Sequence, residues 1–302
     1  MPKLTLRRRR ILWAYAFLLI PLVFFLWIRI YPTLSAFNIS LREWNILAEE
    51  KPWVGLANYA KIFEELGNSR SVTHKAFVNT FLYVLIGMPA QLIIALGVAL
   101  MLDRIRRAVG FFRAAYFIPF VTSAVAVAWV WRWLYQPKFG PINVLLKSVG
   151  LPDQPFLASP DQALVSIAAV VVWQGLGFAI IIFLAGLQQI PQTLYEAARI
   201  DGANGRQEFR YITLPMLNTS IVYLAVLQTI SFLRMFAHVI NMTRQGSGGP
   251  LNSTVTVVLH VYRSGFSSYK MGYASALTVL LFLVILIITV VQLRVLQRRV
   301  DY

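Results

Sequence analysis

Six long apolar runs divide this sequence, and they constrain its fold more than any other feature. Each is about as long as the roughly 20 residues that an α-helix needs to cross the hydrocarbon core of a bilayer. Runs of this length are too long for buried strands, and backbone amides inside lipid must pair within the segment itself. The sequence therefore predicts an all-α, polytopic membrane protein that forms a single transmembrane domain over residues 1–302. The six predicted spans cover residues 11–31, 77–102, 112–134, 164–187, 218–242 and 273–295.

The first run follows four consecutive arginines, Arg7 to Arg10, as the apolar part of a signal peptide does. Its apolar stretch continues beyond 18 residues, however, and no small-residue cleavage site ends it. We therefore expect a first helix that is retained in the membrane.

The positive charge of the chain is distributed unevenly between the two predicted membrane faces. With six spans both termini lie on one side, and that side carries 15 Lys and Arg, against 10 in much longer loops on the other. Because positive residues are retained in the cytoplasm, both termini are predicted to be cytoplasmic. The formal net charge of +16 would suggest nucleic-acid binding in a soluble chain. Here it is mainly a signal of topology, and no nucleic-acid partner is expected.

Three loops are predicted on the external side. Loop 32–76 is expected to form an external cap with a short amphipathic helix near 58–66. Loop 135–163 is rich in Pro and Gly, which predicts ordered but irregular structure. Residues 246–250 read Gly-Ser-Gly-Gly-Pro, which is typical of a flexible crossing.

The cytoplasmic segment 188–217 has the pattern of a short helix, a break and a second helix. Thr193 and Glu196 have the spacing of a capping box, and Gly202 suits the left-handed turn that ends a helix. Between them Ala197 and Ala198 leave a small, smooth surface on which another protein could close. From these residues alone, an ordinary connector between two helices explains the segment equally well.

The same segment resembles a known family signature. Glu196-Ala-Ala, Gly202 and Ile212-Thr-Leu-Pro215 resemble the EAA motif of the membrane subunits of binding-protein-dependent ABC importers. Other stretches resemble the carbohydrate-uptake branch of these permeases, which includes maltose and glycerol-phosphate permeases, over essentially the whole chain. These stretches are Phe117-Ile-Pro-Phe, Trp131-Arg-Trp-Leu, Phe139-Gly-Pro-Ile-Asn, residues 172–178 and 183–191, Gly248-Gly-Pro and Gly272-Tyr-Ala-Ser-Ala. The resemblance implies the type I ABC importer permease fold, in the plasma (inner) membrane of a prokaryote.

The resemblance also implies partners. In that family the EAA segment is a coupling helix that docks on a cytoplasmic ATPase. A dimer of ABC ATPases, a second homologous permease subunit and an external solute-binding protein are expected to complete the importer. This chain has no Gly-x-x-x-x-Gly-Lys motif, so ATP and Mg are expected on the ATPase and the chain itself has no cofactor. The residues implied to contact the ATPase are Glu196, Ala197, Ala198, Asp201, Gly202 and Ala203.

A sugar site is predicted from aromatic and polar residues inside the spans. Aromatic faces and amides recognise sugars, and polar groups inside a membrane are costly enough to indicate function. Four of the residues follow one predicted helix face at i, i+3, i+4 and i+7. The positions that match the sugar site of maltose-type permeases are Phe120, Gln174, Gly175, Phe178, Gln228, Ser231, Phe232 and Met235, and the residues themselves add Trp173 and Arg234.

This site leaves alternatives open. Phe178 and Phe232 stand where the maltose-type permease has Tyr and Asn, so a substrate identical to maltose is disfavoured. The same residues also suit plain packing between helices. Arg234, inside the fifth span, would bind an anionic or polyhydroxylated substrate or pair with an acid of the partner subunit. His238, one turn further, is expected to form an interfacial hydrogen bond.

The predicted function is one half of the translocation pathway of an ATP-driven importer for a sugar or sugar-like polyol. The main alternative, an ion-coupled secondary transporter, requires carboxylates within the membrane, and none of the six runs contains Asp or Glu. A membrane-embedded enzyme requires clustered polar groups, whereas His74, His238 and His260 are scattered and Cys is absent. We therefore expect no catalytic residue and no metal site.

Overall fold

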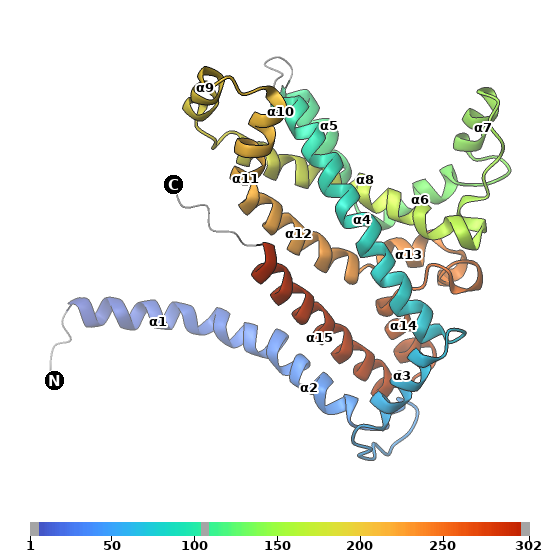
Figure 1. The fold of residues 1–302 in the computed structure, drawn as a ribbon. Helices are drawn as coiled ribbons and strands as arrows, with labels where there is room; N and C mark the ends of the chain where they lie inside the picture. Colours follow the sequence, from blue (N-terminus) through green and yellow to red (C-terminus); the bar gives the residue numbers. More distant parts are fainter. Residues whose placement is uncertain (1–5, 104–108, 297–302) are drawn as a thin grey trace. The chain divides into compact units, whose positions relative to one another are not determined.

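The computed structural model describes residues 6–103 and 109–296, and they are predominantly helical (Figure 1). Within these residues there is no β-strand, only isolated bridges between Arg42 and Trp53 and between Asn45 and Lys270. The all-α fold class is therefore confirmed. The longer helices are α1 (Leu6–Phe25), α2 (Tyr31–Ser40), α3 (Ala57–Gly67), α4 (Val72–Asp103), α5 (Val109–Val121), α6 (Ala124–Leu134), α8 (Pro160–Leu187), α12 (Asn218–Leu233) and α15 (Met271–Leu296).

The chain forms two compact units, and the prediction of one permease domain stays a prediction. The first unit comprises Met1–Phe63 and Val261–Leu280, and the second comprises Glu64–His260 and Leu281–Tyr302. Shorter elements connect the long helices. They are α7 (Pro141–Ser148), η2 (Phe156–Ala158), α9 (Gln192–Ile200), α10 (Gly205–Glu208), η3 (Phe209–Thr213), α11 (Leu214–Met216), α13 (Ala237–Met242), η4 (Arg244–Gly246), η5 (Pro250–Asn252), α14 (Val257–Tyr262) and η6 (Arg263–Ser267).

The first unit begins with an apolar helix longer than the predicted first span. α1, the π-helical turn η1 (Leu26–Ile30) and α2 run together for 35 residues. Beyond them, the Asn58 side chain donates to the carbonyls of Ser40 and Arg42, both at 2.9 Å. These bonds fix the start of α3. The presence of α3 at Ala57–Gly67 confirms the short helix predicted in loop 32–76.

The core of the second unit lies where α4 packs against α8 and α12 (Figure 1). Glycines allow these close crossings. A Cβ atom on Gly87 of α4 would overlap the Phe232 ring of α12, and one on Gly175 of α8 would overlap the Gln91 amide of α4. Small residues that bring helix backbones together are typical of packing in membranes, where lipid is as apolar as the helices.

Two of the predicted spans are wrong as continuous helices. Residues 112–134 form α5 and α6, which meet at 96° around an extended Ser123, and residues 218–242 contain a break between α12 and α13. α12 is itself preceded by a segment, Gly205–Met216, that is bent from it by 63°. The described residues therefore hold four helices long and apolar enough to cross a membrane, or six if each bent pair is one span.

The two breaks are compensated by buried polar side chains. Gln174 donates to the carbonyl of Thr122 at 3.0 Å, and Thr256 donates to the carbonyl of Met235 at 2.8 Å. Interrupted helices are tolerated in membranes when such groups satisfy the freed carbonyls. Apolar content alone could not reveal the breaks. It indicates whether a segment prefers lipid to water, but not whether its helix is continuous.

Loop 135–163 is more regular than predicted, because it contains α7 and η2. Asn143 organises it: its side chain donates to the carbonyls of Pro137 (3.0 Å) and Gln154 (2.9 Å), and it accepts from the Gln154 amide (3.0 Å). The prediction of irregular structure was wrong for residues 141–148, because Pro141 begins a helix at a position where proline is well tolerated. Residues 149–155 form no helix or strand.

Candidate functional site

The segment predicted to couple to an ATPase is built around α9. This helix begins directly after Pro191, whose backbone is extended (φ −60°, ψ 130°), and no side chain caps it. The predicted capping box of Thr193 and Glu196 is therefore wrong, because the N-cap is Pro191, two residues earlier, and Thr193 lies inside the first turn of the helix. A capping box is present further on. Asn204 accepts from the amides of Arg206 and Gln207, and Gln207 accepts from the Asn204 amide, at the start of α10.

The predicted glycine stop of this helix is confirmed. Gly202 has φ +80°, its amide donates to the Arg199 carbonyl at 3.1 Å, and the Ala203 amide donates to the Ala198 carbonyl at 2.8 Å. This pair of bonds is the Schellman arrangement, which satisfies the last carbonyls of a helix. The chain leaves α9 along a defined path as a result.

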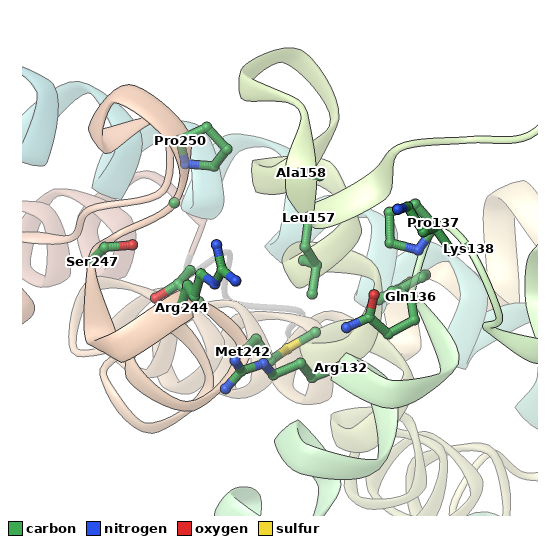
Figure 2. A pocket seen from close by; sticks show the side chains of 13 residues that line it. Arg132, Gln136, Pro137, Lys138, Leu157, Ala158, Met242, Arg244, Ser247 and Pro250 are labelled. Atoms are coloured by element: carbon green, nitrogen blue, oxygen red, sulfur yellow. The ribbon is translucent and has the colours of Figure 1, made fainter.

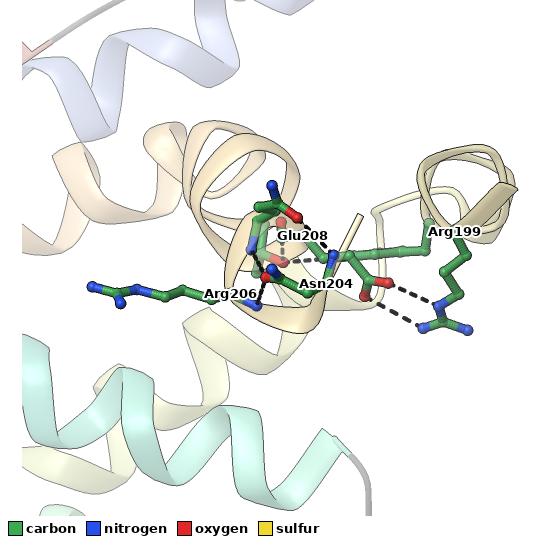
Figure 3. Close-up of polar contacts among 7 residues, drawn as sticks. Arg199, Asn204, Arg206 and Glu208 are labelled. Atoms are coloured by element: carbon green, nitrogen blue, oxygen red, sulfur yellow. Dashed lines mark hydrogen bonds and ion pairs between the residues drawn. The ribbon is translucent and has the colours of Figure 1, made fainter. Parts of the chain in front are cut away.

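An ion pair joins the end of α9 to α10 (Figure 3). Arg199 contacts the Glu208 carboxylate twice, at 2.9 Å from Nε and 3.4 Å from Nη2. The hydrogen bond from Arg199 lowers the pKa of the Glu208 carboxyl from its ordinary value, and the same contact raises the pKa of Arg199. Both ends of the turn around Gly202 are thereby tied to each other.

Tyr195 ties α9 to the body of the second unit. Its hydroxyl pairs with that of buried Thr213 at 2.9 Å, and its ring packs against the apolar core around Leu217 and Leu224. Thr213 ends the π-helical turn η3, which leads through α11 into α12. α9 is thus linked through Thr213 to the segment that leads into α12.

Most of the residues predicted to contact the ATPase are exposed. Glu196, Ala197, Asp201 and Gly202 are exposed, whereas Ala198 and Ala203 are half-buried. Ile200, to which the sequence assigned no role, is 86% exposed, the largest value for any bulky apolar residue in the described part of the chain. An apolar residue next to polar residues in this segment is a pattern that could have indicated a contact residue from the sequence.

Some of the predicted substrate residues, among them Phe120, Gln174 and Phe178, lie at the break between α5 and α6. The Nε2 atom of buried Gln174 donates to the Thr122 carbonyl. The Oε1 atom of the same amide can only accept, and it lies 2.6 Å from Nε2 of His238. His238 therefore carries its proton on Nε2. The expected hydrogen bond of His238 is confirmed, with Gln174 as its partner, and both ends of the Gln174 amide are engaged within the chain.

Aromatic rings flank this polar group. Phe120 stacks on Phe178 with centroids 5.2 Å apart, and Trp173 meets Trp131 edge to face at 5.3 Å. Phe120 and Trp173 remain 41% and 40% exposed, so each has one open side. Trp131 was not among the predicted site residues, although its place in an apolar run beside Arg132 could have indicated it.

The predicted face of the fifth span is wrong in part. Gln228 and Phe232 are buried on α12, but Ser231 is exposed and Met235 lies beyond the helix end at Leu233. Arg234 is the C-cap of α12, with an exposed side chain, rather than a residue deep in a continuous helix. The helical spacing on which the face was predicted does not extend through the break.

Gln91 of α4 was missed. It is 1% exposed, it faces Gly175, and its Nε2 has no hydrogen-bond partner within the described part of the chain. As a polar residue inside an apolar run, it carried the same signal that selected Gln174. Among residues 6–103 and 109–296, no three His, Asp or Glu side chains are grouped so as to hold a metal ion.

Comparison with known proteins agrees with the resemblance to ABC importer permeases. Residues 65–302 match the family described as "Binding-protein-dependent transport system inner membrane component". The chain is 34% identical to the probable ABC transporter permease protein YesP of Bacillus subtilis, over 96% of this chain and 92% of that protein. It is 33% identical to the trehalose/maltose transport system permease protein MalF of Thermococcus litoralis, over 90% and 89%.

The fold is also similar to that of a solved transporter. A chain of a bacterial ABC transporter involved in the import of the acidic polysaccharide alginate superimposes with a TM-score of 0.79. That match is 24% identical and covers 97% of this chain and 98% of the other. With the family match, the relatives and several apolar helices in agreement, the chain belongs to the inner-membrane permease components of binding-protein-dependent ABC transport systems.

Proposed function

We propose that this permease forms one half of the translocation pathway of an ATP-driven importer for a sugar or sugar-like polyol, with both termini in the cytoplasm. The names of relatives such as the trehalose/maltose permease support the substrate class. The excess of Lys and Arg in the terminal, 103–113 and 188–217 segments supports the orientation.

The observation that carries the proposal is the construction of α9. Its residues Glu196, Ala197 and Ile200 are exposed. The contact between Tyr195 and Thr213 anchors the helix to η3 and, through η3, to α12. An exposed apolar side chain beside small residues suits a contact that a partner closes over. Docked on an ATPase, α9 would transmit closure of that ATPase to the membrane helices.

The cluster around Gln174 supports a pathway for a polyhydroxylated solute. Half-exposed Phe120 and Trp173 offer ring faces for the C–H surfaces of a sugar. Buried Gln91 faces Gly175, next to Gln174, and its Nε2 has no partner among the described residues. The second permease subunit would supply the facing half of the site. The external binding protein would deliver the solute, and the ATPase would hold ATP and Mg.

The docking role is tested with Ala197→Trp, assayed in the importer co-expressed with its partner subunits in nanodiscs. We expect the assembled ATPase to be lost, or its stimulation by the loaded binding protein to fall at least about tenfold, because a bulky side chain prevents close approach. Gln192→Trp, exposed on the same helix but outside the predicted contact, is the matched control. Wild-type stimulation in Ala197→Trp would refute the docking role.

A further inference from the structure

A pocket of about 530 Å³ opens at the N-terminal end of α8. α9 follows the other end of this 28-residue helix, about 40 Å away along its axis. The pocket and the proposed coupling helix therefore lie at opposite ends of the second unit. In the proposed orientation, the pocket faces the outside.

Three segments contribute to the wall of this pocket (Figure 2). The end of α6 and the turn after it provide Arg132, Gln136 and Lys138, and the segment around η4 provides Arg244 and Ser247. Figure 2 shows Arg244 and Ser247 on one side of the pocket and Gln136 and Lys138 on the other. The third segment, at η2, adds apolar surface.

All charged side chains that line this pocket are positive. Three of its residues are cations, and no Asp or Glu lines it. Arg132 donates to the Asn241 carbonyl at 3.5 Å and lies over the Trp129 ring, neither of which carries a formal negative charge. Within residues 6–103 and 109–296, none of the three cations pairs with a carboxylate, whereas nearby Lys147 and Asp153 are paired at 2.9 Å.

Like charges around one concavity repel each other, and the repulsion grows where the wall excludes water. Arg132 is only partly exposed, whereas Lys138 and Arg244 are exposed. An anion in the pocket would therefore interact most strongly with Arg132, because water screens its charge least. The volume is within the range of small-ligand sites, about 300–1,000 Å³. Gln136 and Ser247 add groups that suit hydroxyls, and Leu157 and Met242 add apolar surface for a ring.

We propose that this pocket binds the acidic group of an anionic, sugar-sized solute: a carboxylate, a sulfate or a phosphate ester. The part of the proposal that concerns a sugar-like solute and an outward-facing pocket rests on the proposed function. The part that concerns negative charge rests on Arg132, Lys138 and Arg244. The pocket would hold an acidic solute before it reaches the cluster around Gln174.

The test uses the full chain with its partner subunits, in nanodiscs of phosphatidylcholine without ATP. Glucuronate and glucose, which present similar hydroxyls and differ in charge, are titrated while tryptophan fluorescence is followed. We expect glucuronate to bind at least about tenfold more tightly than glucose, and high salt to weaken it. Arg132→Gln and Arg244→Gln should each lower its affinity about tenfold, and Arg132→Lys should retain most of it.

The control is Lys147→Gln, which removes a cation of the same loop that is paired and does not line the pocket. Equal binding of glucuronate and glucose, or an equal loss in Lys147→Gln, would overturn the proposal. In discs that contain phosphatidylglycerol, retention of that lipid dependent on Arg132 and Arg244, without glucuronate binding, would assign the pocket to a lipid headgroup and overturn it as well. Binding is read without ATP, so failure here is distinct from failure of the ATPase-coupling test.

Discussion

Arg199 and Glu208 form a two-contact ion pair that closes the turn between α9 and α10. The guanidinium comes from the last turn of α9, and the carboxylate, whose side chain is only 14% exposed, comes from the last residue of α10. Between them the chain reverses at Gly202, which has a left-handed backbone. The pair therefore fixes the angle at which α9 is presented.

Breaking this pair is expected to loosen the turn without unfolding the protein. In Glu208→Gln the amides of residues 199–208 should exchange with deuterium about two- to fivefold faster, the range for an ion pair in which one partner, here Arg199, is exposed. Arg199→Gln should have a similar effect, and the double variant little more, because both remove the same contact. Additive effects in hydrogen–deuterium exchange would show that the two residues act independently.

The turn should also respond to acid. Because the hydrogen bond from Arg199 lowers the pKa of Glu208 below its ordinary value of 4.5, the pair contributes its full stability above that value. The contribution is lost as the pH falls through the lowered pKa, so pepsin cleavage near residues 199–208 should rise over that acidic range. The wild type should approach the susceptibility of Glu208→Gln at low pH, and a constant difference between them would contradict the assignment.

Ile200 is expected to matter for docking and not for folding. Because its side chain is 86% exposed, Ile200→Ala should leave the melting temperature unchanged. If an ATPase covers this side chain, the same variant should weaken the binding of the ATPase subunits about tenfold in a pull-down titration. Val149→Ala, which changes an apolar residue that is 65% exposed and directly follows α7, is the control. Unchanged ATPase binding in Ile200→Ala would remove Ile200 from the interface.

The position of Gly87 is expected to leave no room for a side chain. Gly87→Ala places a Cβ atom against the Phe232 ring, and the resulting overpacking should destabilise the protein by about 1–3 kcal/mol. Gly97→Ala, on the same helix with no atom within 4 Å of the added Cβ, should be neutral or stabilising by up to about 1 kcal/mol. Thermal unfolding in nanodiscs compares the two variants, and equal melting temperatures would show that the crossing is loose.

Gln174 is expected to stabilise the break in the third span. Gln174→Ala leaves the Thr122 carbonyl and the His238 ring without their partner, which should cost about 1–3 kcal/mol. Ser231→Ala, at an exposed position of α12, should change stability by less than about 0.5 kcal/mol. If Gln174→Ala instead impaired only transport and left the melting temperature unchanged, its role would be that of a substrate ligand.

The sequence by itself determined the all-α membrane class, the places of the apolar runs and the candidate coupling segment. Length and apolar content state whether a segment prefers lipid, and the Gly202 turn depends on local backbone freedom, so both can be read along the chain. The resemblance to ABC permeases rested on local spacing for the same reason.

Tertiary structure decided where those runs break and what the polar residues inside them do. The break at Thr122 and Ser123 depends on Gln174, some 50 residues away, and the break after Leu233 depends on Thr256. Such pairs become neighbours only when the helices pack, because the free energy that stabilises an interrupted helix comes from groups on other helices. The same holds for the pocket lined by Arg132 and Arg244, whose positive charges come together only when α6 and η4 line the same pocket.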